Sequence, residues 1–479
     1  MASSPTFNKA LEATKGLYIT DYSVHDLRFP TSLTGDGTDA MNTTCDYSAA
    51  YVMLYVGPKG TPRAQPPTSV GATHLRGHGM TFTIGRGNEL CCAAIESIVS
   101  GLMVGCSVSD LLVDMGATWR RLVGDPQLRW LGPEKGVIHL ATAAVINAVW
   151  DLFARAEGKP LWRLISDMTP EETVALIPFR YITDALTPQE ALTILKANEG
   201  TKVQRREEMA TSGYPAYTTS AGWSGYDDAK VARLTREALA AGFTHFKLKV
   251  GTSLEADQRR LALVRSIVDN PAEMPPGFVK PRPECLVGKN AGPTGCVVMI
   301  DSNQVFDVPE AISYVSQLAP WHPWFIEEPT APDDALGHAA IRRGLAQSGT
   351  GVATGEHAHS RIVFKQLLQS DAIDVVQIDS CRLAGVNEVL AVMLMAKKFG
   401  KIVCPHAGGV GLCEYVAHLS MIDYVSIAAD LDRNVLEWVD HLHEHFVAPV
   451  SISDRGRYNA PEVPGYSIEF KQESVEDYW

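Results

Sequence analysis

Five side chains that could hold a metal ion or a proton each follow a short apolar run, and they are Asp301, Glu327, Glu356, Asp379 and His406. Successive members are 26, 29, 23 and 27 residues apart, about the length of one strand, one helix and two short loops. In a parallel barrel built from such units, the C-terminal ends of the strands converge on one face. The spacing therefore predicts that these five side chains line one pocket.

The three carboxylates in this series suit a hard divalent cation. Asp301, Glu327 and Glu356 would offer three oxygen ligands from successive strand ends, and Mg²⁺ prefers such ligands while keeping positions open for water or substrate. An acidic residue after a strand can also be a helix N-cap. Three in consecutive units favour the metal site over three separate caps.

Two lysines precede the carboxylates in a run of alternating character. Lys247 and Lys249 are two positions apart, so on a strand both point to the same side, and Phe246 and Leu248 point to the other. Burial and a neighbouring cation both lower a lysine pKa, which would make one of the pair a general base. The alternative is a pair of lysines on an exposed edge strand.

Asp379 and His406 follow consecutive predicted strands, so the carboxylate could hold one imidazole nitrogen and leave the other for proton transfer. Residues 407–409 read Ala-Gly-Gly and allow close approach of the backbone. A lone histidine is more often structural, but this position beside an acid favours a catalytic dyad.

A metal, a lysine base and a histidine acid together indicate a reaction class. A metal that holds a substrate carboxylate acidifies the neighbouring C–H bond, a lysine removes the proton, and a histidine protonates a departing hydroxyl group. We therefore expect dehydration of a hydroxy acid. Two alternatives remain: a racemase or epimerase that returns the proton to the opposite face, and a barrel that has lost activity and serves as a binding scaffold.

The motifs resemble the enolase superfamily, specifically its mandelate-racemase-like acid-sugar dehydratases, and among these the L-fuconate dehydratases. They are IDSNQ (300–304), IEEPT (326–330), TGEH (354–357), QIDSCR (377–382), PHAGG (405–409) and LEWVD (436–440). The resemblance implies Lys249 as base with Lys247 beside it, the His406–Asp379 dyad, and one Mg²⁺ per subunit on Asp301, Glu327 and Glu356.

Further motifs extend the resemblance over nearly the whole chain, among them TDAMN (38–42), FRYITDA (179–185) and AYTTSAGW (216–223). From these and the barrel motifs we expect substrate contacts at seven positions: Asp39, Asn42, Tyr181, Thr218, Ser220, Asn303 and Glu437. GEHAHSR (355–361) departs from the usual residues after the metal-ligating glutamate and could alter selectivity.

The resemblance implies a hydro-lyase acting on a six-carbon acid sugar. The first expectation is conversion of L-fuconate to 2-dehydro-3-deoxy-L-fuconate and water. The alternative is L-galactonate, which carries one additional hydroxyl at C6. An apolar pocket wall discriminates such a difference by only about 10²-fold, so both activities could coexist.

The order of the expected strands and helices predicts an α/β fold. We expect a modified TIM barrel of (β/α)7β type with an α+β capping domain. We expect the cap over residues 1–170, the barrel over 171–437 and a C-terminal segment over 438–479 that returns to the cap. Residues 174–181 are predicted as the first strand after the boundary, and residues 89–114 and 135–156 as helices of the cap. Residues 57–76 and 270–294 are interpreted as loop insertions, and 31–46 as a long loop.

Composition narrows the class of protein. A net charge of −13 argues against nucleic-acid binding, and nine cysteines at irregular spacing indicate neither a disulfide framework nor a zinc site. No stretch reads as the ~18 apolar residues of a membrane-spanning helix. We expect a cytoplasmic protein with no membrane partner, and the resemblance implies a homo-oligomer.

Overall fold

The computed structural model describes residues 8–60, 75–280, 290–432 and 434–479. The central parts of the two predicted insertions, residues 61–74 and 281–289, lie outside the described residues.

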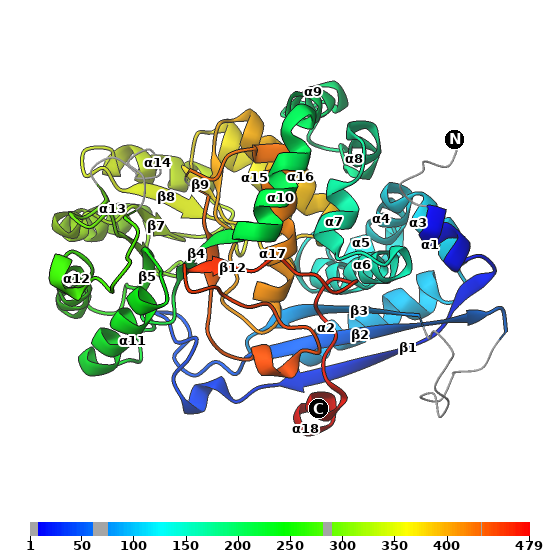
Figure 1. Cartoon of the computed structure of the whole chain (residues 1–479), viewed down its shortest axis with the longest axis horizontal. Coiled ribbons are helices and arrows are strands. Elements are labelled where there is room, and N and C mark those ends of the chain that lie inside the picture. Colours follow the sequence, from blue (N-terminus) through cyan, green and yellow to red (C-terminus); the bar gives the residue numbers. More distant parts are fainter. Residues whose placement is uncertain (1–7, 61–74, 281–289, 433) are drawn as a thin grey trace.

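Eight parallel strands form the central sheet of the described chain, in the order β10-β9-β8-β7-β6-β5-β4-β11. Figure 1 shows β4, β5, β7, β8 and β9 among the helices of this region. They are β4 (Tyr214–Thr218), β5 (His245–Lys249), β6 (Val297–Asp301), β7 (Phe325–Glu327), β8 (Gly351–Thr354), β9 (Val375–Val376), β10 (Ile402–Val403) and β11 (Leu436–Trp438). The seven helices between them are α11 (Asp228–Ala240), α12 (Leu254–Val268), α13 (Val308–Leu318), α14 (Ala335–Leu345), α15 (Arg361–Gln369), α16 (Gly385–Lys398) and α17 (Leu412–Ile422). This alternation confirms the predicted (β/α)7β fold.

Strand register brings the polar strand ends side by side. Lys249 pairs with Asp301 across β5 and β6, and Asp301 pairs with Glu327 across β6 and β7. Glu327 pairs with Ala353, so Glu356 lies three residues farther along, in the loop after β8. Because parallel strands in register end at one edge, residues 78 positions apart in sequence become neighbours.

The N-terminal region forms an antiparallel sheet of β1 (Leu17–Arg28), β2 (Ser48–Pro58) and β3 (Arg76–Thr83). Helices α2 (Asn88–Ile98) and α6 (Gly136–Glu157) pack on it. The β3 backbone meets α6 closely, because a Cβ atom at Gly79 would lie 2.1 Å from the carbonyl oxygen of Ala144. Glycine is therefore required at this position for the helix to reach the sheet.

Helix α6 corrects one expectation. Its 22 residues are long and apolar enough, by length and composition, to cross a membrane, contrary to the expectation that no stretch reaches this limit. In the fold the helix is almost entirely buried, and the Trp150 indole N–H donates to Asn387 Oδ1 on α16 at 2.8 Å. This is the environment of a core helix between the N-terminal sheet and the barrel.

The strand predicted over residues 174–181 is wrong. Residues 170–176 form α8 (Pro170–Leu176) instead, because Thr169 and Glu172 make a reciprocal capping box and Pro170 occupies the first turn. Two more helices, α9 (Pro188–Asn198) and α10 (Lys202–Ser212), precede β4, and both pack on the outer helices of the barrel. The first barrel strand is therefore β4.

The single helix predicted over residues 89–114 is also wrong. Helix α2 continues as a π-helix, η2 (Val99–Met103), turns at Gly105 with φ of 84°, and resumes as α3 (Val108–Val113). Three further helices complete this part of the chain: α1 (Asn8–Ala13), α4 (Met115–Val123) and α5 (Pro126–Leu131). A short helix, α7 (Leu161–Ser166), follows α6.

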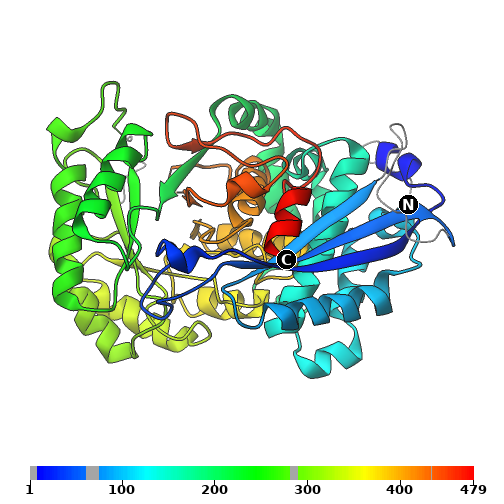
Figure 2. The same ribbon diagram turned by 90° about the horizontal axis from the view of Figure 1, so that it is seen from below.

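The C-terminal segment crosses from the barrel to the N-terminal sheet. Strand β12 (Arg457–Tyr458) pairs antiparallel with β4, and helix α18 (Gln472–Tyr478) packs against β1. Phe29, beyond the end of β1, stacks on Phe470 with ring centroids 6.2 Å apart. Figure 2 shows the red C-terminal helix against the blue sheet. The C-terminal segment thus joins the barrel to the N-terminal sheet.

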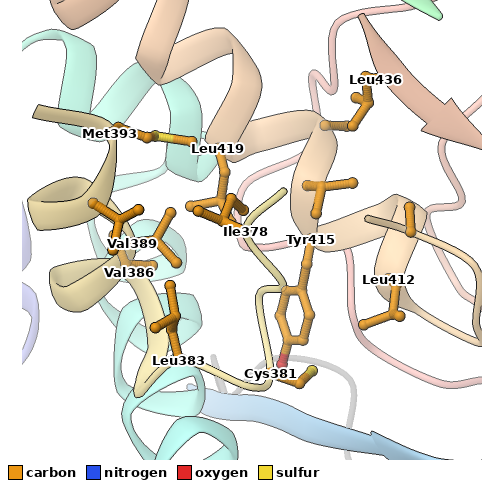
Figure 3. Close-up of a cluster of buried hydrophobic side chains, with 14 of the residues drawn as sticks. Ile378, Cys381, Leu383, Val386, Val389, Met393, Leu412, Tyr415, Leu419 and Leu436 are labelled. Carbon is orange, nitrogen blue, oxygen red and sulfur yellow. The ribbon is translucent and has the colours of Figure 1, made fainter. Parts of the chain in front are cut away.

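Apolar side chains from α16 and α17 pack behind the strand end that carries Asp379. Ile378, directly before that aspartate, lies among Val386, Val389 and Leu419, all fully buried (Figure 3). Close packing of this kind fixes backbone positions at the strand end. The dyad residue therefore extends from a rigid base.

Asp423, at the start of the π-helix η8 (Asp423–Ala428), is a buried carboxyl that is not among the predicted site residues. Neither of its oxygens has a hydrogen-bond partner in the described part of the chain. Burial raises its pKa to about 7, and Lys397 opposes this shift only in part. The folded protein therefore binds a proton here at pH values where the unfolded chain has released it.

This difference predicts a stability profile. The pKa of Asp423 in the folded protein exceeds its ordinary value of 3.8. The contribution of Asp423 to the free energy of unfolding is therefore largest below pH 4, and it falls by up to about 4 kcal/mol as the pH rises to 7. Urea unfolding of Asp423→Asn against wild type should show this difference growing from pH 4 to pH 8. For the exposed control Asp454→Asn, the difference in unfolding free energy from wild type should not change with pH in this way. If the difference between Asp423→Asn and wild type is also constant from pH 4 to pH 8, the prediction is wrong.

Candidate functional site

A cavity of about 350 Å³ lies over the C-terminal ends of the barrel strands, beneath the loop at residues 31–46. This volume suits a small metabolite. Eight of the predicted site residues line it: Asp39, Asn42, Lys249, Asn303, Glu356, Asp379, His406 and Glu437. Asp301, Glu327 and Lys247 do not line the cavity, and each is buried with 1% or less of its surface exposed.

Asp301, Glu327 and Glu356 form a compact carboxylate cluster, in which one oxygen from each lies within 4.8 Å of the others. Burial raises the pKa of Glu327 well above its usual value, and the charge of Asp301 adds to this effect. Glu356 Oε2 is buried without a hydrogen-bond partner in the described chain. Three buried carboxylates, one of them with an oxygen that accepts no hydrogen bond, fit a divalent cation such as Mg²⁺.

Lys247 lies beneath this cluster as a fixed countercharge. Its Nζ contacts Glu327 at 2.9 Å, Glu437 at 3.0 Å and Asp301 at 3.5 Å. Burial lowers its pKa, but these carboxylates outweigh burial and hold it well above the ordinary value. Lys247 therefore stays charged and balances part of the negative charge of the site.

Lys249 extends from the end of β5 into the cavity and contacts Asp301 at 2.5 Å. Its Nζ also lies 5.6 Å from the centre of the Trp223 ring. The expectation that the pKa of Lys249 is lowered is wrong when the neighbouring carboxylates hold no metal ion. Burial and Lys247 do lower the pKa of Lys249, but Asp301 and Glu356 raise it more.

Asp379 and His406 form a hydrogen-bonded pair, with His406 Nδ1 donating to Asp379 Oδ2 at 2.8 Å. The other oxygen of Asp379 accepts from two backbone amides, Cys381 N and Arg382 N, at 2.7 Å each. His406 Nε2 lies 3.5 Å from Glu356. Burial lowers the pKa of His406, but Glu356 and Asp379 raise it to about 9, so the ring is protonated at neutral pH.

Glu437 anchors the loop that carries the histidine. Its Oε2 accepts from the Ala407 backbone N–H at 2.7 Å, and its Oε1 accepts from the Thr219 hydroxyl. Burial raises the pKa of Glu437, but Lys247 and His406 bring it down to about 2. A Cβ atom at Gly408 would lie 3.1 Å from His406 Nε2, so glycine there leaves the reactive nitrogen accessible.

The loop at residues 31–46 forms the roof of the cavity, and Asp39 shapes its tip. One Asp39 oxygen accepts from the backbone N–H groups of Met41 and Asn42, both at 2.7 Å. The Asn42 side-chain amide donates to the other oxygen at 3.2 Å. The predicted long loop thus has an ordered tip, and this tip lines the same cavity as Lys249.

Three of the predicted substrate contacts do not line the cavity. Tyr181 lies at a separate surface hollow with Thr183 and Lys365, in a turn that begins at residue 180. Thr218 accepts from Ser220 N at 3.1 Å, and Ser220 accepts from the Asp440 backbone N–H at 3.1 Å. Both hydroxyls are engaged in shaping the loop after β4.

Several cavity residues were not named as site residues from the sequence, among them Tyr47, Phe82, Arg86, Trp223, Gln304, His357 and Arg382. Most come from loops, where no periodicity identifies the inward-facing positions. His357 had a signal in its sequence, since it follows a predicted metal ligand directly. Burial lowers its pKa, but Glu328 raises it to about 10.

Comparison with known proteins places this geometry in a family. Residues 286–474 match the family model described as "enolase C-terminal domain-like". The chain is 54% identical to L-galactonate dehydratase of Hypocrea jecorina over 461 residues, covering 96% of this chain and 93% of that protein. It is 50% identical to mitochondrial enolase superfamily member 1 of Bos taurus over 453 residues, covering 95% and 94%.

Solved structures agree with the fold. The crystal structure of human mitochondrial enolase superfamily member 1 superposes with a TM-score of 0.86 at 48% identity, covering 96% of each chain. The structure of L-talarate dehydratase from Polaromonas sp. JS666, complexed with Mg and L-glucarate, superposes with a TM-score of 0.65 at 19% identity, covering 96% and 97%. The latter likeness concerns the fold alone. With its carboxylate cluster, lysine pair and histidine dyad on the strand ends of one barrel, the chain belongs to the enolase superfamily.

Proposed function

We propose that the protein is a Mg²⁺-dependent hydro-lyase that dehydrates a six-carbon acid sugar, with L-galactonate as its substrate. The observation that carries this proposal is the 54% identity, over nearly the full chain, to an L-galactonate dehydratase. This reverses the order expected from the motifs, in which L-fuconate came first and L-galactonate second. The product would be the 2-keto-3-deoxy acid and water.

Asp301, Glu327 and Glu356 are the residues that would hold the metal. When bound, Mg²⁺ supplies positive charge that holds the substrate carboxylate and stabilises the charge left when the C2 proton departs. Once the three carboxylates serve as ligands, their charges no longer act on Lys249 alone. Burial and Lys247 both lower the pKa of Lys249, and their effect on that pKa is then opposed less strongly.

Lys249 is the base in this proposal. Its Nζ lies at the cavity wall on the Asp301 side, where it can take the C2 proton of an acid sugar. Lys247 cannot take this role, because its Nζ is enclosed by Glu327, Glu437 and Asp301 below the cavity. The two lysines therefore divide the work into proton transfer and charge balance.

His406 is the acid. The C2–H bond breaks toward Lys249, the electron pair forms the C2–C3 double bond, and the C3–O bond breaks as His406 Nε2 donates a proton to the leaving hydroxyl. Water departs, and the resulting enol tautomerises to the 2-keto acid. Asp379 holds the ring by its Nδ1–H at 2.8 Å and favours the charged form that donates.

A substrate screen tests the proposal. Purified protein with Mg²⁺ is incubated with L-galactonate, L-fuconate and L-rhamnonate, and kcat/KM is determined from formation of 2-keto-3-deoxy acid. We expect the highest kcat/KM for L-galactonate, measurable turnover of L-fuconate, and loss of both on removal of Mg²⁺ by EDTA. If none of the three acids reacts with folded protein that binds Mg²⁺, the proposal is wrong.

A further inference from the structure

His357 is a cavity residue to which the reaction above gives no part. It follows Glu356 directly in the loop after β8, and its side chain is 40% exposed where it faces the cavity. The neighbouring catalytic groups, Lys249 and His406, have side chains that are 10% exposed or less. The His357 side chain is therefore more exposed than that of either residue assigned to proton transfer.

Contacts to one ring nitrogen, Nδ1, hold the ring of His357 in one orientation. Its Nδ1–H donates to Glu328 Oε1 at 2.9 Å, and Nδ1 also lies 3.4 Å from Glu356 Oε1. Gln304 Nε2 donates to both oxygens of Glu328, at 3.1 and 3.0 Å, and lies 2.8 Å from the same ring nitrogen. A completely buried carboxylate thus aligns both side chains.

The backbone beneath these contacts adopts a costly conformation. Asn303, Gln304 and Glu328 have φ angles of 46°, 68° and 42°, in the left-handed region that non-glycine residues rarely enter. Such strain persists where surrounding structure fixes it, and it concentrates at ligand sites. The loops after β6 and β7 therefore hold Gln304 and Glu328 in position to orient the histidine ring.

The opposite ring nitrogen, Nε2, has no hydrogen-bond partner among the residues that the structure describes. We propose that His357 Nε2 binds a hydroxyl group of the acid-sugar chain and selects substrates that carry it. A hydroxyl both donates and accepts, so it pairs with this nitrogen whether or not the ring is protonated. This contact rests on the proposed acid-sugar substrate and adds a specificity-determining residue to that site.

A cycle of substrate and protein changes tests the contact without relying on turnover. Mg²⁺-loaded Lys249→Ala protein binds substrate without consuming it, so dissociation constants can be measured by calorimetry for L-galactonate and its 4-deoxy, 5-deoxy and 6-deoxy analogues. The same series is measured with His357→Phe added. His359→Phe, in the same loop but outside the cavity lining, is the matched control.

We expect one deoxy analogue to bind about tenfold more weakly than L-galactonate when His357 is present. With His357→Phe, L-galactonate itself should bind about tenfold more weakly, and that analogue should lose nothing further. His357→Gln, which keeps a polar group, should restore part of the preference, and His359→Phe should leave every ratio unchanged.

Equal ratios for all three analogues with and without His357 would overturn the contact. So would a weaker Mg²⁺ affinity of His357→Phe as its only effect, since the ring would then act by holding Glu356. If wild-type protein neither binds nor converts any acid sugar, the proposed function itself fails. The two failures are therefore distinguishable.

Discussion

Lys249→Ala should lower kcat for dehydration by about 10⁴-fold, because positioned general bases contribute 10²- to 10⁴-fold and no other lysine of the described residues lines the cavity. The nearest candidate, Lys247, is enclosed by three carboxylates. Exchange of the substrate C2 proton with solvent deuterium should be lost in parallel. Both rates are measurable by NMR with L-galactonate in D2O.

Lys249→Arg is the matched control for charge. An arginine keeps the positive charge beside Asp301 but is not deprotonated in proteins, so it cannot serve as a base. We expect Lys249→Arg to be as inactive as Lys249→Ala while its thermal unfolding stays close to that of wild type. If the arginine variant retains more than about a tenth of the activity, Lys249 acts through its charge and a different group removes the proton.

His406→Asn should separate the two halves of the reaction. We expect dehydration to fall by about 10²- to 10⁴-fold, while exchange of the C2 proton continues, because Lys249 and the carboxylate cluster are intact. Loss of both rates would mean that the histidine also takes part in proton removal. Asp379→Asn should give a smaller loss, since the ring remains but its Nδ1–H loses a charged acceptor.

The same deuterium-exchange experiment tests whether the protein is instead a racemase or epimerase. If His406 instead returned a proton to the opposite face of C2, wild-type protein would incorporate deuterium at C2 with inversion and without release of water. Dehydration as the main reaction of the wild type, with exchange in His406→Asn, would contradict that alternative.

The polar strand ends could be predicted from sequence because the fold repeats one unit. An apolar run followed by a charged residue every 23 to 29 positions identifies parallel strands that end on the same face. The register of β5, β6 and β7 then makes Lys249, Asp301 and Glu327 direct neighbours.

The wrong predictions arose where a helix-capping motif favoured another secondary structure, or where the charge of a residue distant in sequence changed a pKa. The capping box at Thr169 and Glu172 favours a helix where a strand was predicted. Tyr181 was placed at the site by the resemblance of FRYITDA (179–185) and not by a position in the fold. The direction of the Lys249 pKa was misjudged because the sequence shows its neighbour Lys247 but not the distance to Asp301. His357 and Gln304 lie in loops whose course depends on tertiary contacts.

Helix α6 has a consequence for how the chain is made. One side of this apolar helix packs on β3, which is synthesised before it, but another side is covered by α16, about 230 residues farther along. At 5 to 20 residues per second, a ribosome needs roughly 10 to 50 s to supply that cover. The nascent chain therefore exposes an apolar surface throughout this interval, and a fragment that ends before the last barrel units should require chaperones or aggregate.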